Sequence, residues 1–217
     1  MGTRNQSSFV GDVLKLVSGT TLAQALTVLI APVLSRLYAP DAFGAAAVFI
    51  SITSVVGVVA CLRYELAIML PERDEDAANL LAVSLCSVLA IAGLSAILVW
   101  HRGDAIMRLL NASDLIPYLW LIPLALLADG VFLALNYWNS RTKAFGRLSI
   151  ALVGQSIVRN GSQLGFGMLG QPSAASLIAG QVLGSAVVAS ILGGQIWQDD
   201  QHTLTHSIRP RRMLKWA

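Results

Sequence analysis

Long apolar stretches separated by short polar segments occupy nearly the whole chain of 217 residues. The first covers 16–35 without a single charged residue. A helix that crosses the hydrocarbon core of a membrane needs about 20 mostly apolar residues, whereas barrel strands are shorter and alternate in polarity. The pattern therefore predicts membrane helices, the form in which a lipid-embedded backbone satisfies its own hydrogen bonds. The predicted helices lie at about 16–37, 42–62, 77–100, 115–139, 148–170 and 173–197.

The composition agrees with this class. Hydrophobic residues make up 55% of the chain and charged residues 12%, and the mean hydropathy is +0.67. A soluble domain carries about 25% charged residues. The polar start, 1–12, lacks the apolar core of a cleaved signal peptide, so we expect the first helix to be retained. The predicted fold is an all-α membrane protein with six transmembrane helices.

The distribution of cations predicts how the helices are oriented. With the N-terminus in the cytoplasm, eleven of the fifteen Lys and Arg residues fall inside and three fall outside. The remaining one, Arg159, lies within the fifth predicted helix. The positive-inside rule therefore favours six spans with both termini cytoplasmic. The predicted organisation is a cytoplasmic segment at 1–15, a transmembrane lobe at 16–197, and a basic tail or linker at 198–217.

Glycine and proline positions refine the helices. Gly161 and Gly165, and likewise Gly180 and Gly184, have the spacing that lets helix backbones approach closely, so we expect both pairs at helix interfaces. Pro123 lies inside the fourth predicted helix, where a missing N–H is expected to produce a kink.

Residue types that perform catalysis are scarce. No paired carboxylates, Ser-His-Asp set or Cys-His set is recognisable, so we predict no enzyme activity and no catalytic residues. His202 and His206 lie four residues apart but in a polar tail without nearby carboxylates, so no metal site is expected. Cys61 and Cys86 fall within apolar stretches and are expected to be buried, inert thiols. No cofactor is predicted.

A polar stripe interrupts the fifth predicted helix. Spacings of three and four residues place its members on one side of a helix. They are Gln155, Ser156, Arg159, Asn160 and Gln163. A central arginine that faces lipid costs about 2.5–3.5 kcal/mol, so the stripe is expected to face the bundle interior or a water-filled cavity.

An acidic residue is predicted at the same depth as the arginine. Arg159 lies about 18 Å along its helix from Arg147, and Asp129 lies about 16 Å from Ser140 on the preceding antiparallel helix, at about 1.5 Å per residue. Two interpretations are open. Asp129 and Arg159 form a structural ion pair, or Arg159 offers its charge to an anionic substrate, with Asp129 as its resting partner or as a proton-coupling carboxylate.

Several motifs lie near the ends of the predicted helices. They are 18–24 (SGTTLAQ), 32–44 (PVLSRLYAPDAFG), 62–71 (LRYELAIMLP), 76–80 (DAANL), and 138–141 (WNSR) followed by Phe145. Together with Arg159, they resemble bacterial polysaccharide biosynthesis proteins of the oligosaccharide-flippase type. These proteins belong to the multidrug/oligosaccharidyl-lipid/polysaccharide exporter superfamily, which also includes drug/cation antiporters and the lipid II flippase. The resemblance covers nearly the whole chain.

The resemblance implies a fold and a function. Members have two six-helix lobes around a central cavity that opens alternately to each side, and this chain resembles the amino-terminal lobe. They are thought to move undecaprenyl-pyrophosphate-linked sugar units across the inner membrane for O-antigen, lipopolysaccharide or other polysaccharide assembly. Arg159 matches a cationic cavity position, where a guanidinium can form bidentate hydrogen bonds with phosphate oxygens. Asp129, Gln155, Asn160 and Gln163 are the further candidates for substrate binding.

The expected partners follow from the same resemblance. They are the lipid-linked oligosaccharide, membrane lipids, and possible contacts with a polysaccharide polymerase and glycosyltransferases, without nucleic acid. Because the sequence stops after its basic linker, at Ala217, we expect a truncated or split chain whose second lobe comes from a second copy or a separate partner. Two alternatives stay open. One is a drug/cation antiporter lobe, which Asp129 favours, and the other is a non-transporting scaffold subunit for polysaccharide assembly, which the glycine pairs would serve.

Overall fold

The computed structural model describes residues 3–60, 64–71, 73–109 and 112–207. Helices form almost all of this described part, and no strand occurs in it. The long helices are α1 (Thr3–Leu37), α2 (Pro40–Ala60), α4 (Asp74–Leu109), α5 (Leu121–Arg141), α6 (Phe145–Met168) and α7 (Ala174–Ser207). Between them lie the short helix α3 (Tyr64–Ala67) and the 3-10 helix η1 (Ser113–Tyr118). The prediction of an all-α fold is confirmed.

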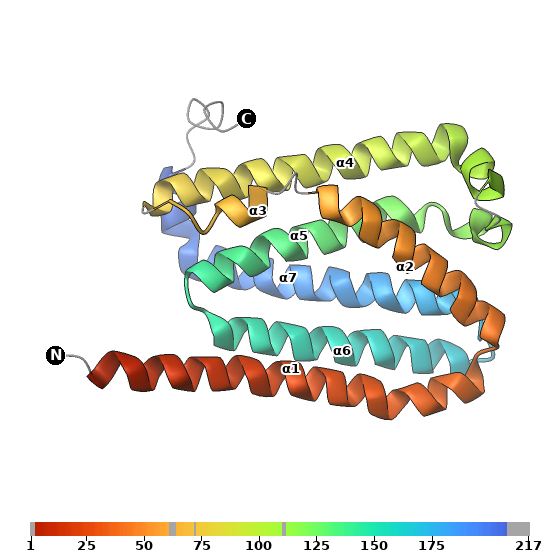
Figure 1. Ribbon diagram of the computed structural model, residues 1–217, viewed down its shortest axis with the longest axis horizontal. Coiled ribbons are helices and arrows are strands. Elements are labelled where there is room, and N and C mark those ends of the chain that lie inside the picture. The colour runs from red at the N-terminus through yellow and green to blue at the C-terminus, as the bar shows by residue number, and fades with distance from the viewer. Residues whose placement is uncertain (1–2, 61–63, 72, 110–111, 208–217) are drawn as a thin grey trace.

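The chain is a multi-pass membrane protein. Within the described residues, five helices are long and apolar enough to cross a membrane. They are α1, α2, α4, α5 and α7. Helix α6 is also long enough, at 24 residues or about 36 Å, but the polar stripe around Arg159 lowers its hydropathy. The sixth crossing therefore stays a prediction, although α6 lies alongside α1 and α7 in the same bundle (Figure 1).

Several helix ends differ from those predicted, because helices continue beyond the apolar residues that mark them in the sequence. Helix α1 begins at Thr3, so residues 3–15 are already helical, and α7 continues to Ser207. Helix α4 extends to Leu109. The predicted location of 1–15 and of the tail in the cytoplasm is not tested by these helix ends, and 208–217 lie outside the described residues.

The predicted kink at Pro123 is wrong, because the fourth apolar stretch is divided into two helices. Its start forms η1, which contains Pro117, and α5 begins only at Leu121. Pro123 is thus the third residue of α5. The first N–H groups of a helix have no partner within it, so a proline in the first turn removes no hydrogen bond.

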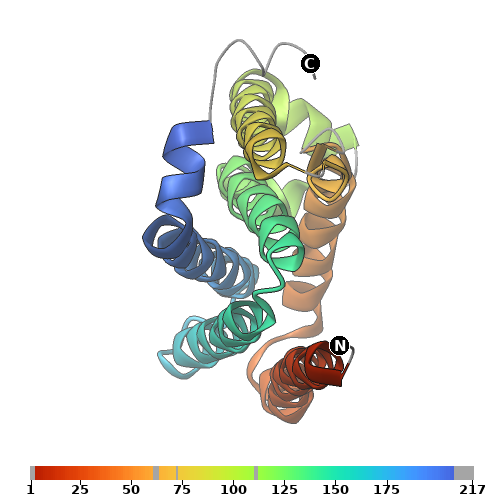
Figure 2. The ribbon, with the colours of Figure 1, turned by 90° about the vertical axis from the view of Figure 1, so that its left-hand side faces the viewer.

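The helices form a bundle in which α6, α7, α5 and α4 follow one another as packed neighbours (Figures 1 and 2). Helix α1 packs along α6, at one side of the bundle. Helix α2 crosses over α5 and α7 on the side away from α6 and has almost no contact with α1 beyond their shared turn. Consequently, α1 and α2 diverge from their turn, and a pocket lined by both helices and by α6 and α7 lies between them.

Two apolar clusters form the core, one towards each end of the bundle. The outer cluster lies near the α1–α2 turn and includes Tyr38, Phe49, Leu126 and Ile178. The inner cluster, near the α5–α6 turn, includes Ile68, Leu80, Trp138, Val188 and Leu192. Between the two clusters lies a polar level of Asp129, Gln155, Ser156, Arg159, Asn160 and Ser185, which belong to α5, α6 and α7. The apolar packing is therefore interrupted at mid-bundle.

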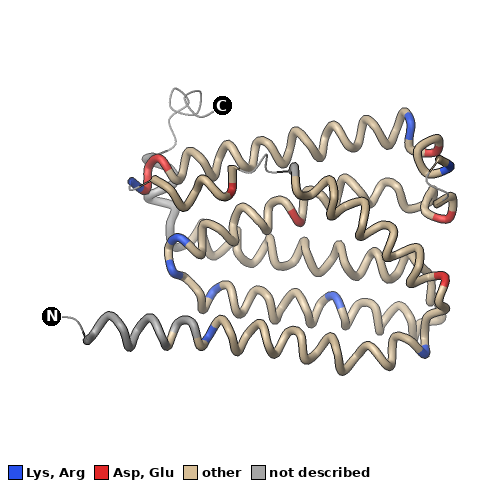
Figure 3. The backbone as a smooth tube through the Cα atoms, in the orientation of Figure 1, with Lys and Arg blue, Asp and Glu red and all other residues tan. Residues whose placement is uncertain are grey.

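Charge follows the same division. Lys, Arg, Asp and Glu residues gather at the two ends of the bundle, and the long helices carry little charge between them (Figure 3). This is the distribution expected when the middle of each helix lies in hydrocarbon, where an ionised side chain is costly.

The glycine pairs behave differently from each other. A Cβ added at Gly180 would lie 2.5 Å from Cγ of Gln163, and one at Gly184 would lie 2.9 Å from Cβ of Arg159. These two glycines therefore allow α7 to approach α6, as predicted. At Gly161 and Gly165 an added Cβ would meet nothing within 4 Å, so the expected interface there is wrong. The spacing alone does not indicate which side of a helix faces a neighbour.

The cysteine prediction is corrected in part. Cys86 is an exposed, free thiol on α4, because the residue lies on the outward side of that helix. In a membrane this side faces lipid, so an apolar environment does not require burial in the protein. Cys61 lies outside the described residues.

Candidate functional site

Helices α1 and α6 run side by side in the same direction with a constant register. The hydroxyl of Ser156 donates to the carbonyl oxygen of Ala23 at 2.8 Å, and Nδ2 of Asn160 donates to Oγ1 of Thr27 at 3.1 Å. Both pairs are separated by 133 residues in the sequence. Positions on α1 therefore lie level with positions 133 residues later on α6, which places the polar side chains of both helices along one seam.

The seam is closed tightly at its inner end. Gly19 lies so close to Ser149 that an added Cβ would be 2.6 Å from Cβ of that serine. The Ser149 hydroxyl donates to the carbonyl oxygen of Lys15 at 2.8 Å and to that of Phe145 at 2.9 Å. A small residue and a hydroxyl thus bring the backbones together, a common arrangement for helices in membranes.

Two of the predicted cavity residues serve this packing. Asn160 is 1% exposed, and its Nδ2 also donates to Oγ of Ser156 at 3.0 Å. Gln163 is buried, and its Nε2 donates to the carbonyl oxygen of Leu177 on α7 at 3.0 Å. The Tyr38 hydroxyl donates to the backbone oxygen of Gln163 at 2.6 Å. Because these groups hold α1, α6 and α7 together, Asn160 and Gln163 have a structural role besides lining a cavity.

Arg159 lies on a neighbouring side of α6, near the middle of the bundle. It is about 21 Å along the helix axis from Phe145 and about 14 Å from Met168. Its side chain is partly buried, and its Nε has no hydrogen-bond partner among the residues the structure describes. Gly184 packs against its Cβ and so fixes the base of the side chain against α7. The structure thus positions a cation deep in the bundle without neutralising it by a direct contact.

Asp129 on α5 lies at a similar depth but does not form a direct ion pair with Arg159, the first of the two interpretations left open by the sequence. In the described part of the chain, no salt bridge or hydrogen bond joins its carboxylate to the guanidinium of Arg159. The two charges are near enough to attract each other through space. Asp129 therefore offsets the buried cation only from a distance, and the guanidinium has no anionic side chain in direct contact among the described residues.

Two pockets meet at Arg159. One, of about 200 Å³, lies between α1 and α6 on the inner side of the arginine and is partly polar. Its lining includes Thr20, Gln24, Gln155 and Ser156. The other, of about 500 Å³, lies on the outer side between α1, α2, α6 and α7. Most of its wall is apolar, with Ala31, Leu34, Phe43, Ala46, Ala47, Ile50, Leu177 and Ile178.

The two pockets lie on the same sides of α1 and α6. Spacings of three and four residues connect Thr20, Gln24, Thr27, Ala31 and Leu34 along α1. Arg159 lines both pockets. We call the two pockets together, from Thr20 to Leu34 on α1, the α1–α6 groove. The groove is more polar on the inner side of Arg159 than on the outer side.

Sequence reasoning missed the contribution of α1. Thr20, Gln24 and Thr27 lie three or four residues apart in the charge-free stretch 16–35, and all three line the α1–α6 groove. Their spacing was a usable signal, because polar residues on one side of a membrane helix avoid lipid. Gln155 was identified, and the structure places it in the inner, polar part of the groove.

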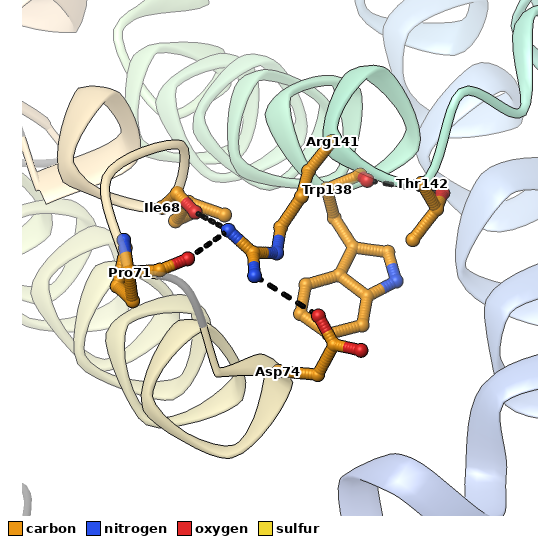
Figure 4. A network of polar contacts seen from close by, with 6 residues as sticks. All are labelled: Ile68, Pro71, Asp74, Trp138, Arg141 and Thr142. Carbon is orange, nitrogen blue, oxygen red and sulfur yellow. Dashed lines mark hydrogen bonds and ion pairs between the residues drawn. The ribbon is translucent and has the colours of Figure 1, made fainter.

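Arg141, the last residue of the predicted motif 138–141, fastens the end of the bundle near the α5–α6 turn (Figure 4). Its Nη1 donates to the carbonyl oxygens of Ile68 at 3.1 Å and Pro71 at 2.7 Å. Its Nη2 forms a salt bridge with Asp74 at 2.9 Å. One side chain at the end of α5 thus holds the α3–α4 turn, far along the bundle from the α1–α6 groove.

These features define a helical membrane protein with a half-buried, unneutralised arginine beside an open groove, an arrangement suited to binding an anion within the membrane. Residues 33–209, well over half of the chain, match the family model described as polysaccharide biosynthesis protein. The chain therefore belongs to the polysaccharide biosynthesis protein family. Neither a curated protein nor a solved structure gives a significant match. The family and the membrane helices together indicate a transport-related role in polysaccharide biosynthesis.

Proposed function

We propose that this chain is one lobe of a flippase that moves undecaprenyl-pyrophosphate-linked oligosaccharide from the cytoplasmic to the outer leaflet of the inner membrane. The product would be used for O-antigen, lipopolysaccharide or a related surface polysaccharide. In this proposal the chain acts as a transporter and not as an enzyme. Its cargo is an anionic lipid, so the protein must offer positive charge within the membrane.

Arg159 is the observation that carries the proposal. Its guanidinium lies at mid-depth, beside the groove, without a salt bridge in the described part of the chain. An arginine in this position costs about 2.5–3.5 kcal/mol, and intramembrane charges that persist despite this cost usually have a function. A diphosphate would supply the missing acceptors through charge-assisted, bidentate hydrogen bonds.

The separation of α1 and α2 supports the need for a further subunit. Because these two helices barely touch beyond their turn, the outer part of the groove opens to the side of the bundle. A second copy of the chain or a separate lobe would enclose it. We further propose that both termini are cytoplasmic and that polymerase and glycosyltransferase partners supply and use the cargo.

The alternatives are less well supported. A drug/cation antiporter needs an acidic group in its binding cavity, but Asp129 does not line either pocket of the α1–α6 groove. A scaffold subunit needs no open groove at all. A scaffold could use the uncovered side of α6 at Gly161 and Gly165 as a contact surface, but it would not account for an Arg159 without an ion-pair partner among the described residues.

The proposal can be tested in the native host by deleting the gene and restoring variants of the full chain. Loss of the gene is expected to abolish the surface polysaccharide and to cause the lipid-linked intermediate to accumulate inside. Arg159→Ala should neither restore the surface polysaccharide nor remove the accumulated intermediate. Arg159→Lys should restore part of the activity, because it keeps the charge but loses the bidentate geometry. Arg102→Ala, at an exposed position of α4, is the matched control and should restore full display.

Full restoration by Arg159→Ala, at wild-type protein levels in the membrane, would remove the proposed role of the arginine. A scaffold would give a different result: the intermediate itself would fail to form, since assembly and not transport would be impaired. Measuring both the surface polymer and the lipid-linked intermediate therefore separates the two functions.

A further inference from the structure

The α1–α6 groove contains two glutamine side chains that nothing in the fold uses. Gln24 on α1 is exposed and Gln155 on α6 is partly buried, and both line the inner pocket. Neither side-chain amide forms a hydrogen bond within the described residues. Asn160 and Gln163, a short distance along the same helix, do form such bonds to neighbouring helices. The two free amides therefore have no evident role in packing.

Their level in the bundle places the amides together. With the register of 133 residues, Gln24 is level with Ile157, and so lies within two residues of Gln155 along the seam. Gln155 is one helical turn, about 5.4 Å along the axis, from Arg159 towards the inner end. Gln24 and Gln155 thus line the groove from opposite sides, immediately inward of the cation.

We propose that Gln24 and Gln155 form a hydroxyl-binding subsite that holds the first sugar of a lipid-linked saccharide, with the diphosphate at Arg159 and the lipid chain in the outer, apolar pocket. This inference rests on the proposed function and deepens it. A side-chain amide offers two donors and one acceptor oxygen, which matches a sugar hydroxyl that both donates and accepts. Polar groups make up a larger share of the inner pocket's lining, which suits a sugar, and the lining of the outer pocket is mostly apolar, which suits a hydrocarbon chain.

The order of the three parts also fits a lipid whose head group has entered the bundle from the cytoplasmic side. With the orientation proposed above, the diphosphate lies near the middle of the membrane at Arg159, the sugar points to the cytoplasm, and the chain points towards the outer half of the membrane. A phospholipid offers the same anionic group and apolar chain but a smaller polar head. The two amides are therefore the groups that distinguish a sugar-bearing lipid from the surrounding membrane lipids.

Binding to the purified full-length protein in detergent tests the subsite. The probes are undecaprenyl diphosphate, the lipid-linked oligosaccharide extracted from the host membrane, and phosphatidylglycerol. Wild-type protein should bind the oligosaccharide form about tenfold more tightly than undecaprenyl diphosphate, the effect of one or two additional hydrogen bonds. Gln24→Met and Gln155→Met keep the length of the side chain but remove its hydrogen bonds, so the double variant should lose this preference.

The same variants provide the controls. Their affinity for undecaprenyl diphosphate should be unchanged, which also shows that they are folded, and Gln198→Met at an exposed position of α7 should keep the preference. Arg159→Ala should weaken both undecaprenyl ligands. If the double variant keeps the preference for the oligosaccharide form, or loses affinity for both forms equally, the subsite is refuted. If wild-type protein binds neither form more tightly than phosphatidylglycerol, the proposed function itself fails.

Discussion

Two neighbouring sides of helix α6 use polar residues in opposite ways. On the side towards α1, Ser156 and Asn160 are buried and hydrogen bonded across the seam. On the neighbouring side, Gln155 lacks any side-chain hydrogen bond and Arg159 leaves its buried Nε unpaired, within the described part of the chain. All four residues line the groove, but only Ser156 and Asn160 are hydrogen bonded to α1. Neither pair of residues faces lipid. Ser156 and Asn160 stabilise the bundle through their hydrogen bonds, whereas Gln155 and Arg159 place polar groups in the bundle without hydrogen bonds to other described residues that would offset the cost of burying them. The comparison teaches that polar residues one position apart on α6 serve different purposes: those bonded to α1 hold the helices together, and those without a described partner are left to line the groove.

The largest expected effect follows from replacing Arg159 by an apolar residue of similar length. Arg159→Met should reduce transport to the background level, because no other described cation lines the groove. The same variant should not unfold more easily than wild type, since it removes a buried charge that costs about 2.5–3.5 kcal/mol. Transport in cells and thermal unfolding in detergent measure the two effects. If the variant lost both activity and stability, Arg159 would have a structural role in helix packing instead of a role in binding the cargo.

A smaller effect is expected where α7 meets α6. Gly184→Leu should lower the free energy of unfolding by about 2–3 kcal/mol, because the new side chain would overlap Cβ of Arg159 and the carbonyl oxygen of Gln155. Thermal unfolding monitored by circular dichroism measures the change. An unchanged unfolding curve would mean that α7 does not lie against this part of α6.

Next in size is the loss of the seam hydrogen bonds. Asn160→Leu should lower the free energy of unfolding by about 1–2 kcal/mol, because it removes the donor to Thr27 and Ser156 and leaves their hydroxyls less well satisfied. The same unfolding experiment applies. Gln155→Leu, five residues away on the groove side, is the matched control and should change stability by less than about 0.5 kcal/mol. Equal losses in both variants would erase the distinction between the two sides of α6.

The smallest effect is expected on the third, outward side of α6. Gly161→Ala and Gly165→Ala should alter the unfolding free energy by less than about 0.5 kcal/mol in detergent, since an added Cβ meets nothing within 4 Å at either position. If either alanine reduced transport in the native membrane while leaving stability intact, this side of α6 would be a contact surface for the second lobe. Surface polysaccharide display in cells is the measurement that reveals such a contact.

Much of the architecture could be predicted from the sequence, because lipid imposes a simple rule. Apolar stretches of about 20 residues become helices, and the depths of Arg159 and Asp129 follow from the rise per residue. Helix ends were harder to predict. Helix α4 continues to Leu109 and α1 begins at Thr3, since hydropathy marks the part of a helix in lipid and not the whole helix.

The sequence could not predict which residues of the polar stripe form hydrogen bonds to α1 and which stay unbonded. Gln155 and Ser156 are adjacent in the sequence, and both fit a spacing of three or four residues with Asn160 or Arg159. Both line the inner pocket, and only the position of α1 decides that Ser156 forms a hydrogen bond across the seam while Gln155 forms none with the described residues. For the same reason, one glycine pair lies at an interface and the other does not.

Water accessibility at α6 tests the central claim most directly. In a variant without Cys61 and Cys86, single cysteines placed at Arg159, Asn160 and Ile157 can be reacted with a charged, membrane-impermeant thiol reagent in open membrane sheets. The structure predicts rapid labelling at position 159, which is partly exposed in the groove, and slow labelling at the buried position 160 and at position 157, which is exposed in apolar surroundings. Labelling at position 159 as slow as at position 157 would show that Arg159 faces no aqueous groove and would contradict the account.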